Sequence, residues 1–208
     1  FKPLAPELEP ETVVKALRSF PPGTSPGPTS LRAQHLLDAM PVGDENSFLQ
    51  QLTAVVNLLA QGQGCATATP SLAGAGLVAV PKPNGGVRPI AIGEIYRRLT
   101  GKCLLQHVRA EARSFLWPAQ VGVCVPLGAE VVVHSVRGWM QRHANTSGKV
   151  LVKLDFSNAF NTVSREAVLQ ATHNNFPSLS RWASWCYGNA SNLQFGTSSV
   201  QSASGVQQ

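Results

Sequence analysis

The stretch KVLVKLDFSNAFNTVSREAVL, residues 149–169, contains the clearest strand pattern of the sequence and the start of the helix that follows. Apolar side chains occupy both faces of its first part, which predicts a mostly buried β-strand over residues 149–156. Asp155 comes at the carboxyl end of this strand and is one of only three aspartates in the chain. Sites are often built at strand ends, so Asp155 is a candidate functional residue; the alternative is that it only caps a turn or the next helix.

Composition limits the classes of protein to consider. The chain has 208 residues and a net charge of +6, which fits one large domain or two closely joined subdomains and favours polyanionic partners. Its four cysteines lack zinc or disulfide spacing, and we expect them to be reduced and buried in an intracellular protein. No run approaches the roughly 20 apolar residues of a membrane span, so no membrane partner is expected. The chain begins at Phe1 and ends at Gln208 without a closing element, and we expect it to be a piece of a longer protein.

Periodicity and turn residues predict helices mixed with short strands, the α/β (α+β) class. Two β-rich runs flank a Pro-Asn-Gly-Gly turn and predict a hairpin with Lys82 and Arg88 near its tip. An amphipathic helix with a basic exposed side is expected over residues 95–117, and Ser30 is expected to cap a helix over 30–40. Further helices are expected over residues 11–20, 47–61, 128–143 and 164–173, and short strands over 192–208.

Several motifs resemble one known family when they are taken together. Asp155 opens the pattern D-x-x-x-A-F after an apolar run, and PKPNGGVRPIAI forms the hairpin upstream. SFPPGTSPGPTSLRAQHL precedes them, AQVGVCVPLGAE lies between them and SGVQQ ends the chain. Together, and in their order along the chain, these motifs resemble those of the reverse transcriptases of non-LTR retrotransposons. The resemblance implies the fingers and partial palm of a right-hand polymerase fold, with a helical lead-in over residues 1–70, fingers over 71–148 and partial palm over 149–208.

The resemblance also implies a chemistry. In the family, the aspartate at the position of Asp155 and the backbone carbonyl of the next residue, here Phe156, bind Mg²⁺ or Mn²⁺. The reaction would be two-metal phosphoryl transfer that extends a DNA primer on an RNA template with deoxynucleoside triphosphates. An intracellular location is implied, and a nuclear one if the element is eukaryotic.

The resemblance assigns further residues to substrate binding. Lys82 and Arg88 would grip the incoming triphosphate, which suits an ammonium and a guanidinium group. Phe160 would be the steric gate that excludes a ribose 2′-hydroxyl; the alternative is a core phenylalanine that follows Ala159 into the next helix. Gln208 would belong to the nucleotide-binding turn. Apart from the resemblance, the basic exposed side of the helix over residues 95–117 is expected to bind nucleic acid through Arg97, Arg98 and Lys102.

The chain departs from the family at two places. Thr29 and Ser30 stand where these enzymes usually have Asp and Gly. The family's Tyr-x-Asp-Asp would lie beyond residue 208, and Glu166 is the only acidic residue after Asp155. One aspartate cannot hold two divalent ions, so we expect the chain alone to be inactive.

Two other functions remain open. One is an RNA-templated RNA polymerase, although viral members usually place a second aspartate where this chain has Phe160. The other is a non-catalytic nucleic-acid-binding descendant of a polymerase. Trp182, Trp185 and Tyr187 offer rings for base stacking, but packing of a helix into the core is the favoured interpretation.

Overall fold

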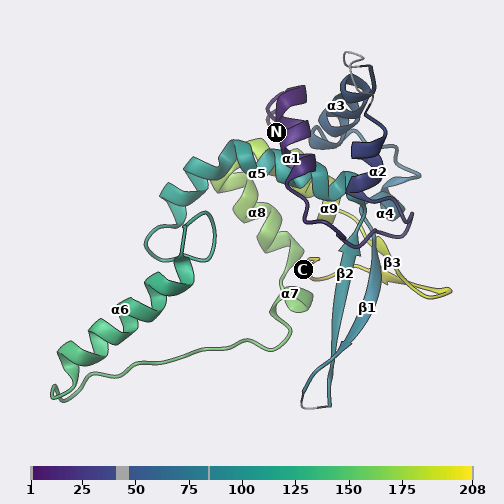
Figure 1. Cartoon of the computed structure of the whole chain (residues 1–208). Helices are drawn as coiled ribbons and strands as arrows, with labels where there is room; N and C mark the ends of the chain where they lie inside the picture. The colour runs from purple at the N-terminus through teal and green to yellow at the C-terminus, as the bar shows by residue number, and fades with distance from the viewer. Residues whose placement is uncertain (1, 41–46, 84, 208) are drawn as a thin grey trace. The chain divides into compact units, whose positions relative to one another are not determined.

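The computed structural model describes residues 2–40, 47–83 and 85–207 and confirms a mixed α/β chain (Figure 1). Its longer helices agree with the predicted ranges to within a few residues. The described helices are α1 (Pro10–Arg18), α2 (Ala33–Asp38), α3 (Ser47–Ala60), α4 (Thr69–Leu72), α5 (Ile95–Leu116), α6 (Gly128–His143), α7 (Ala159–Thr162), α8 (Arg165–Asn175) and α9 (Ser180–Tyr187). The described strands are β1 (Ala75–Pro81), β2 (Val87–Gly93), β3 (Ser191–Phe195) and β4 (Ser198–Ser202).

The four strands form one mixed sheet in the order β2-β1-β3-β4. The predicted hairpin is confirmed, because β1 and β2 pair antiparallel from Ala75↔Gly93 to Pro81↔Val87. β3 joins β1 in parallel over a short register, Ala75↔Leu193 and Gly76↔Gln194. A Cβ on Gly74 would collide with the carbonyl oxygen of Asn192, so only glycine allows the two strands to approach here.

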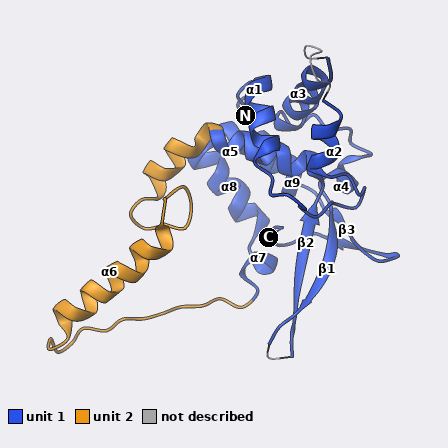
Figure 2. Ribbon diagram, viewed as in Figure 1, with its two compact units in different colours: residues 1–106, 158–208 blue, residues 107–157 orange. Residues whose placement is uncertain are grey.

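The chain divides into two compact units, which Figure 2 shows in different colours. Unit 1 comprises residues 1–106 and 158–208, and unit 2 comprises residues 107–157. Unit 1 contains the whole sheet and a core in which Leu17, Ile95 and Leu99 are completely buried. A second cluster of this unit contains Trp185 and Cys186, with Trp182 against it. The expected core role of α9 is therefore confirmed.

The predicted strand over residues 149–156 is wrong. These residues have no strand assignment, and their apolar side chains lie open, with 79% of Val150 and 75% of Phe156 exposed. A strand needs a neighbour for its backbone N–H and C=O groups, and among the described residues no strand pairs with this segment. The apolar run indicates a preference for β-structure, but a strand forms only where a partner strand is present.

Two smaller expectations are also corrected. Cys103 and Cys186 are buried as expected, but Cys65 is exposed and Cys124 is only partly buried. Burial raises the pKa of the Cys103 thiol to about 11. Ser30 does not cap α2, because that helix begins at Ala33 with Arg32 at the N-cap position.

Across the described residues, none of the helices combines the length and apolar character needed to cross a membrane.

Ser30 has a φ of 64°, a left-handed conformation that serine adopts at a cost and glycine adopts freely. We therefore expect Ser30→Gly to raise the free energy of unfolding by about 0.5–1 kcal/mol, after allowance for the greater freedom of glycine in the unfolded chain. Urea denaturation measures this change. Ser25→Gly is the matched control in the same loop, since Ser25 is not among the residues with positive φ. A loss of stability in Ser30→Gly equal to that of the control would contradict the prediction.

Candidate functional site

The tip of the β1–β2 hairpin carries the two basic residues predicted to bind a triphosphate. The amide of Lys82 donates to the carbonyl of Gly86 at 2.7 Å, which continues the ladder past Pro81. Arg88 pairs with Val80, and side chains two residues apart on a strand share a face, so Lys82 and Arg88 project from the same face of the hairpin. Such diagonal neighbours lie about 7–8 Å apart, a separation that one phosphate group can bridge.

The same hairpin face also offers apolar surface. Val78 is 44% exposed and Val80 is 38% exposed, and both alternate in register with Lys82. Arg88 is exposed, whereas Lys82 is half-buried. Two cations at the tip and valines behind them form a surface that can contact the backbone and the bases of a nucleic acid.

The expected exposure of Arg97 is wrong. Only 5% of this side chain is exposed, and its Nη1 donates to the carbonyl of Ala73 at 2.6 Å. Its guanidinium also lies over the Tyr187 ring, 4.8 Å from the centroid. Arg97 therefore joins α5 to the sheet and to α9 and has no surface to offer a phosphate.

Arg98 and Lys102 are half-buried against the proline-rich loop that follows α1. Both cations lie over the Phe20 ring, at 5.8 Å for Arg98 and 4.7 Å for Lys102. Arg98 also donates to the carbonyl of Ser25 at 2.7 Å, and the Lys102 ammonium lies 3.1 Å from the hydroxyl of Ser19. Desolvation lowers the pKa of Arg98, and the charge of Glu94 opposes that shift. Both side chains hold the loop, which limits their reach toward a nucleic acid.

Glu94 organises this loop, and sequence reasoning did not single it out. The carboxylate is 1% exposed and accepts from the amide of Thr29 at 2.8 Å and from its hydroxyl at 2.7 Å. Glu94 directly precedes α5, and a negative charge at the N-terminus of a helix is stabilised by the helix dipole. A Cβ on Gly27 would lie 2.8 Å from the Cα of Glu94, so the loop passes α5 with no room for a side chain there.

Asp155 and Phe156 belong to unit 2, in the segment after α6. Both are exposed. They offer one carboxylate and one backbone carbonyl, whereas Mg²⁺ takes six oxygen ligands in octahedral geometry. The part of the chain that the structure describes contains no group of three or more His, Cys, Asp or Glu residues placed to hold a metal ion. These residues therefore do not fit a two-metal centre by themselves.

Phe160 lies in α7 of unit 1 and is half-exposed. Its carbonyl accepts from the amide of Val206 at 2.7 Å, and the amide of Gly205 donates to the carbonyl of Val163 at 3.2 Å. The predicted gate and the start of the predicted nucleotide-binding turn, which are far apart in the sequence, therefore meet. Gln208 itself lies outside the described residues.

Arg165 fixes this junction and was also missed by sequence reasoning. Its guanidinium donates to three carbonyl groups, at 2.7 Å to Gly205, 2.8 Å to Ser202 and 3.2 Å to Asn189. It also lies over the Tyr187 ring at 5.5 Å. Arg165 is the first residue of α8, where the helix dipole disfavours a cation. A basic residue at the first position of a helix is unfavourable for the helix itself, so the sequence contains a hint that the Arg165 side chain makes a contact elsewhere.

No family model matches this chain, and no curated protein matches it either. The assignment of a family therefore remains a proposal.

Removal of the Glu94 charge tests the loop contact. We expect Glu94→Gln to lower the free energy of unfolding by about 1.5–3 kcal/mol, because one of the two oxygens that accept from Thr29 becomes a donor. Amide exchange in residues 21–30 should also become faster. Glu111→Gln, an exposed site on α5, is the control. Unchanged exchange in the loop would show that Glu94 does not hold it.

Replacement of Arg165 by lysine tests the second contact. Lysine keeps the charge but lacks the planar fork that reaches several carbonyl groups. We expect Arg165→Lys to cost about 1.5 kcal/mol or more and to increase amide exchange in residues 198–206, whereas Arg113→Lys, an exposed control on α5, changes neither. Equal exchange in the two variants would argue against the assigned role.

Proposed function

We propose that the chain is part of an RNA-directed DNA polymerase of the non-LTR retrotransposon kind and that it contacts nucleic acid or nucleotide phosphates through the β1–β2 hairpin. The observation that carries this proposal is the placement of Lys82 and Arg88 on one face of the hairpin, close to its tip. An arginine fork and a lysine point charge together suit the oxygens of phosphate groups. The net charge of +6 favours the same polyanionic partners.

A second observation supports the polymerase part of the proposal. Phe160 and Val206 come from the two motifs that the family resemblance assigns to nucleotide selection, and they are joined by a backbone hydrogen bond. Phe160 is 50% exposed, so it has surface to place against a sugar. In this proposal it favours deoxyribonucleotides over ribonucleotides by steric exclusion of the 2′-hydroxyl.

In this proposal the chain is one part of a longer polymerase, and the metal-dependent chemistry needs residues outside the chain. Mg²⁺, when bound, would activate the primer hydroxyl and neutralise the triphosphate. Asp155 supplies a single carboxylate for that purpose, and the remaining carboxylates would come from a longer protein. Binding of phosphates at the hairpin belongs to this chain alone and can be tested on it directly.

Binding of an oligonucleotide should depend on salt through the hairpin cations. Each phosphate neutralised contributes about 0.7–0.9 to the log–log slope, so Lys82→Ala/Arg88→Ala should reduce the magnitude of the slope by about 1.4–1.8. Fluorescence anisotropy over a range of salt concentrations measures the slope.

The control removes the same charge elsewhere. Lys15→Ala/Arg18→Ala takes two exposed cations from α1 and should leave the slope within error of the original protein. If both double variants shift the slope equally, binding is a property of net charge and the hairpin assignment fails.

Polymerase chemistry is tested in the complete protein. Asp155→Asn keeps the shape of the side chain but removes its charge, so primer extension with Mg²⁺ should fall by far more than about tenfold. Retention of activity within that limit would make Asp155 a structural residue. A complete protein that binds nucleic acid but never extends a primer would instead support the non-catalytic alternative.

A further inference from the structure

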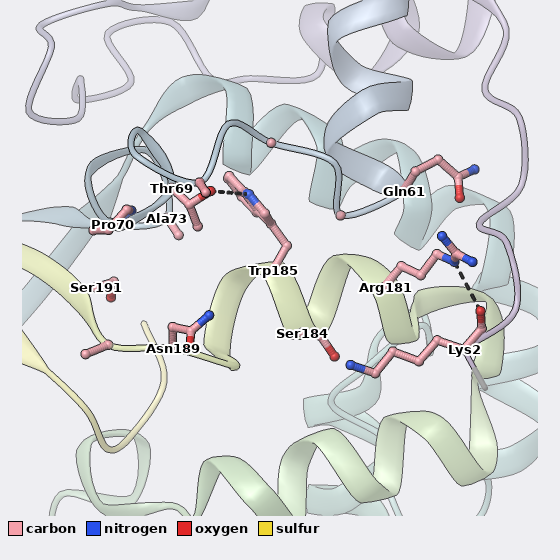
Figure 3. A pocket seen from close by; sticks show the side chains of 14 residues that line it. Lys2, Gln61, Thr69, Pro70, Ala73, Arg181, Ser184, Trp185, Asn189 and Ser191 are labelled. Carbon is pink, nitrogen blue, oxygen red and sulfur yellow. Dashed lines mark hydrogen bonds between the residues drawn. The ribbon is translucent and has the colours of Figure 1, made fainter.

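Two adjoining pockets of unit 1 lie apart from the residues assigned so far. The first has a volume of about 630 Å³ and lies between α9, the segment before α4 and the N-terminal segment (Figure 3). The second, of about 540 Å³, lies between α8 and the end of α9. They share Lys2, Ser184, Asn189 and Ala190, so together they form one groove, which we call the α9 groove.

The charge of the α9 groove is mainly positive. Lys2 and Arg181 line the first pocket, and no acidic residue is among the described residues that line it. Lys2 and Arg165 line the second pocket, where Glu166 is the only carboxylate among the described lining residues. A concave surface with this balance attracts anions.

The basic groups of the first pocket keep donors available for a ligand. The Nε of Arg181 donates to the carbonyl groups of Lys2 and Pro3 at 3.1 and 2.9 Å, which holds the N-terminal segment against α9. Its two terminal nitrogens make no hydrogen bond within the described part of the chain. In Figure 3 the ammonium of Lys2 extends toward the hydroxyl of Ser184, and Asn189 lines the same pocket near the end of α9.

We infer that the α9 groove binds phosphate groups, and that its ligand is the backbone of a single-stranded nucleic acid. A guanidinium with free terminal nitrogens, an ammonium and neutral donors is a set that suits phosphate oxygens. Two connected pockets can hold successive phosphates of one chain, whereas a single small anion would occupy only one of them. The choice of nucleic acid as the source of the phosphates rests on the proposed function, whereas the phosphate site does not.

Lys2→Gln is the variant that tests the groove, because this side chain is exposed and its ammonium supports no described hydrogen bond. With a fluorescent oligothymidylate at low salt, we expect Lys2→Gln to weaken binding by about threefold or more, since one cation next to the phosphates is lost. Lys15→Gln, which changes another exposed lysine outside the groove, should bind as the original protein does.

Trp185 gives a second, local measurement. Its indole N–H donates to the Thr69 hydroxyl at 3.1 Å beside the first pocket, and its NMR signal can be assigned with Trp185→Phe. Oligothymidylate should shift this signal, whereas that of Trp139 in unit 2 should stay in place. An unmoved Trp185 signal together with equal affinity of Lys2→Gln and Lys15→Gln would overturn the inference.

Inorganic tripolyphosphate separates the two sources of phosphate. If it shifts the Trp185 signal and the oligonucleotide does not, the groove is a site for free polyphosphates and the nucleic-acid part of the inference is wrong. If the oligonucleotide shifts the signal and Lys82→Ala/Arg88→Ala binds it normally, the groove inference holds and the hairpin proposal fails. If only the hairpin variant loses binding and the Trp185 signal stays in place, the hairpin proposal holds and the groove inference fails.

Discussion

The fold of unit 1 depends on two arginines that bind backbone carbonyl groups around one tyrosine. Arg97 of α5 and Arg165 of α8 both lie over the ring of Tyr187. Arg97 donates to the carbonyl of Ala73 just before β1, and the side-chain amide of Gln207 donates to the same oxygen at 3.0 Å. The end of the described chain is thereby tied to the sheet and to three helices. The carbonyl groups of Ala73 and Gly205 belong to buried residues, where a backbone acceptor needs a donor from the protein.

This constraint explains why two motifs far apart in sequence meet. Arg165 holds the carbonyl groups of Ser202 and Gly205, and the next residue, Val206, then reaches the carbonyl of Phe160. The contact that supports nucleotide selection in the proposed function is therefore positioned by a charge that touches no substrate. The loop around Thr29 is held in a similar way, since the buried carboxylate of Glu94 accepts hydrogen bonds from the amide and the hydroxyl of Thr29.

Sequence patterns predicted the parts of this fold that local interactions decide. The helices α3, α5 and α6 and the β1–β2 hairpin have strong periodicity or turn residues, and they form where expected. The segment 149–156 has an equally strong pattern but forms no strand, because pairing depends on a second segment that its own sequence cannot specify. In this segment the local preference for a strand and the structure differ most clearly, since the apolar side chains are exposed.

The candidate site could be predicted only in part, for a related reason. The position of Lys82 and Arg88 near the hairpin tip could be predicted because the turn fixes the register of both strands, whereas their binding of phosphate stays a prediction. Arg97 was placed on an exposed helix face, but its neighbour across the fold is a carbonyl that needs a donor, and helical periodicity does not contain that information. The roles of Glu94 and Arg165 likewise come from partners distant in the sequence, 65 residues away for Thr29 and 40 for Gly205.

The hairpin proposal is tested most directly by mapping where a single-stranded oligonucleotide contacts the chain. An oligonucleotide that carries a photoreactive base can be cross-linked to the protein, and the modified peptides can be identified by mass spectrometry. We predict cross-links on the hairpin, residues 75–93, that disappear as the salt concentration rises. Cross-links that never include the hairpin, at any salt concentration, would contradict it.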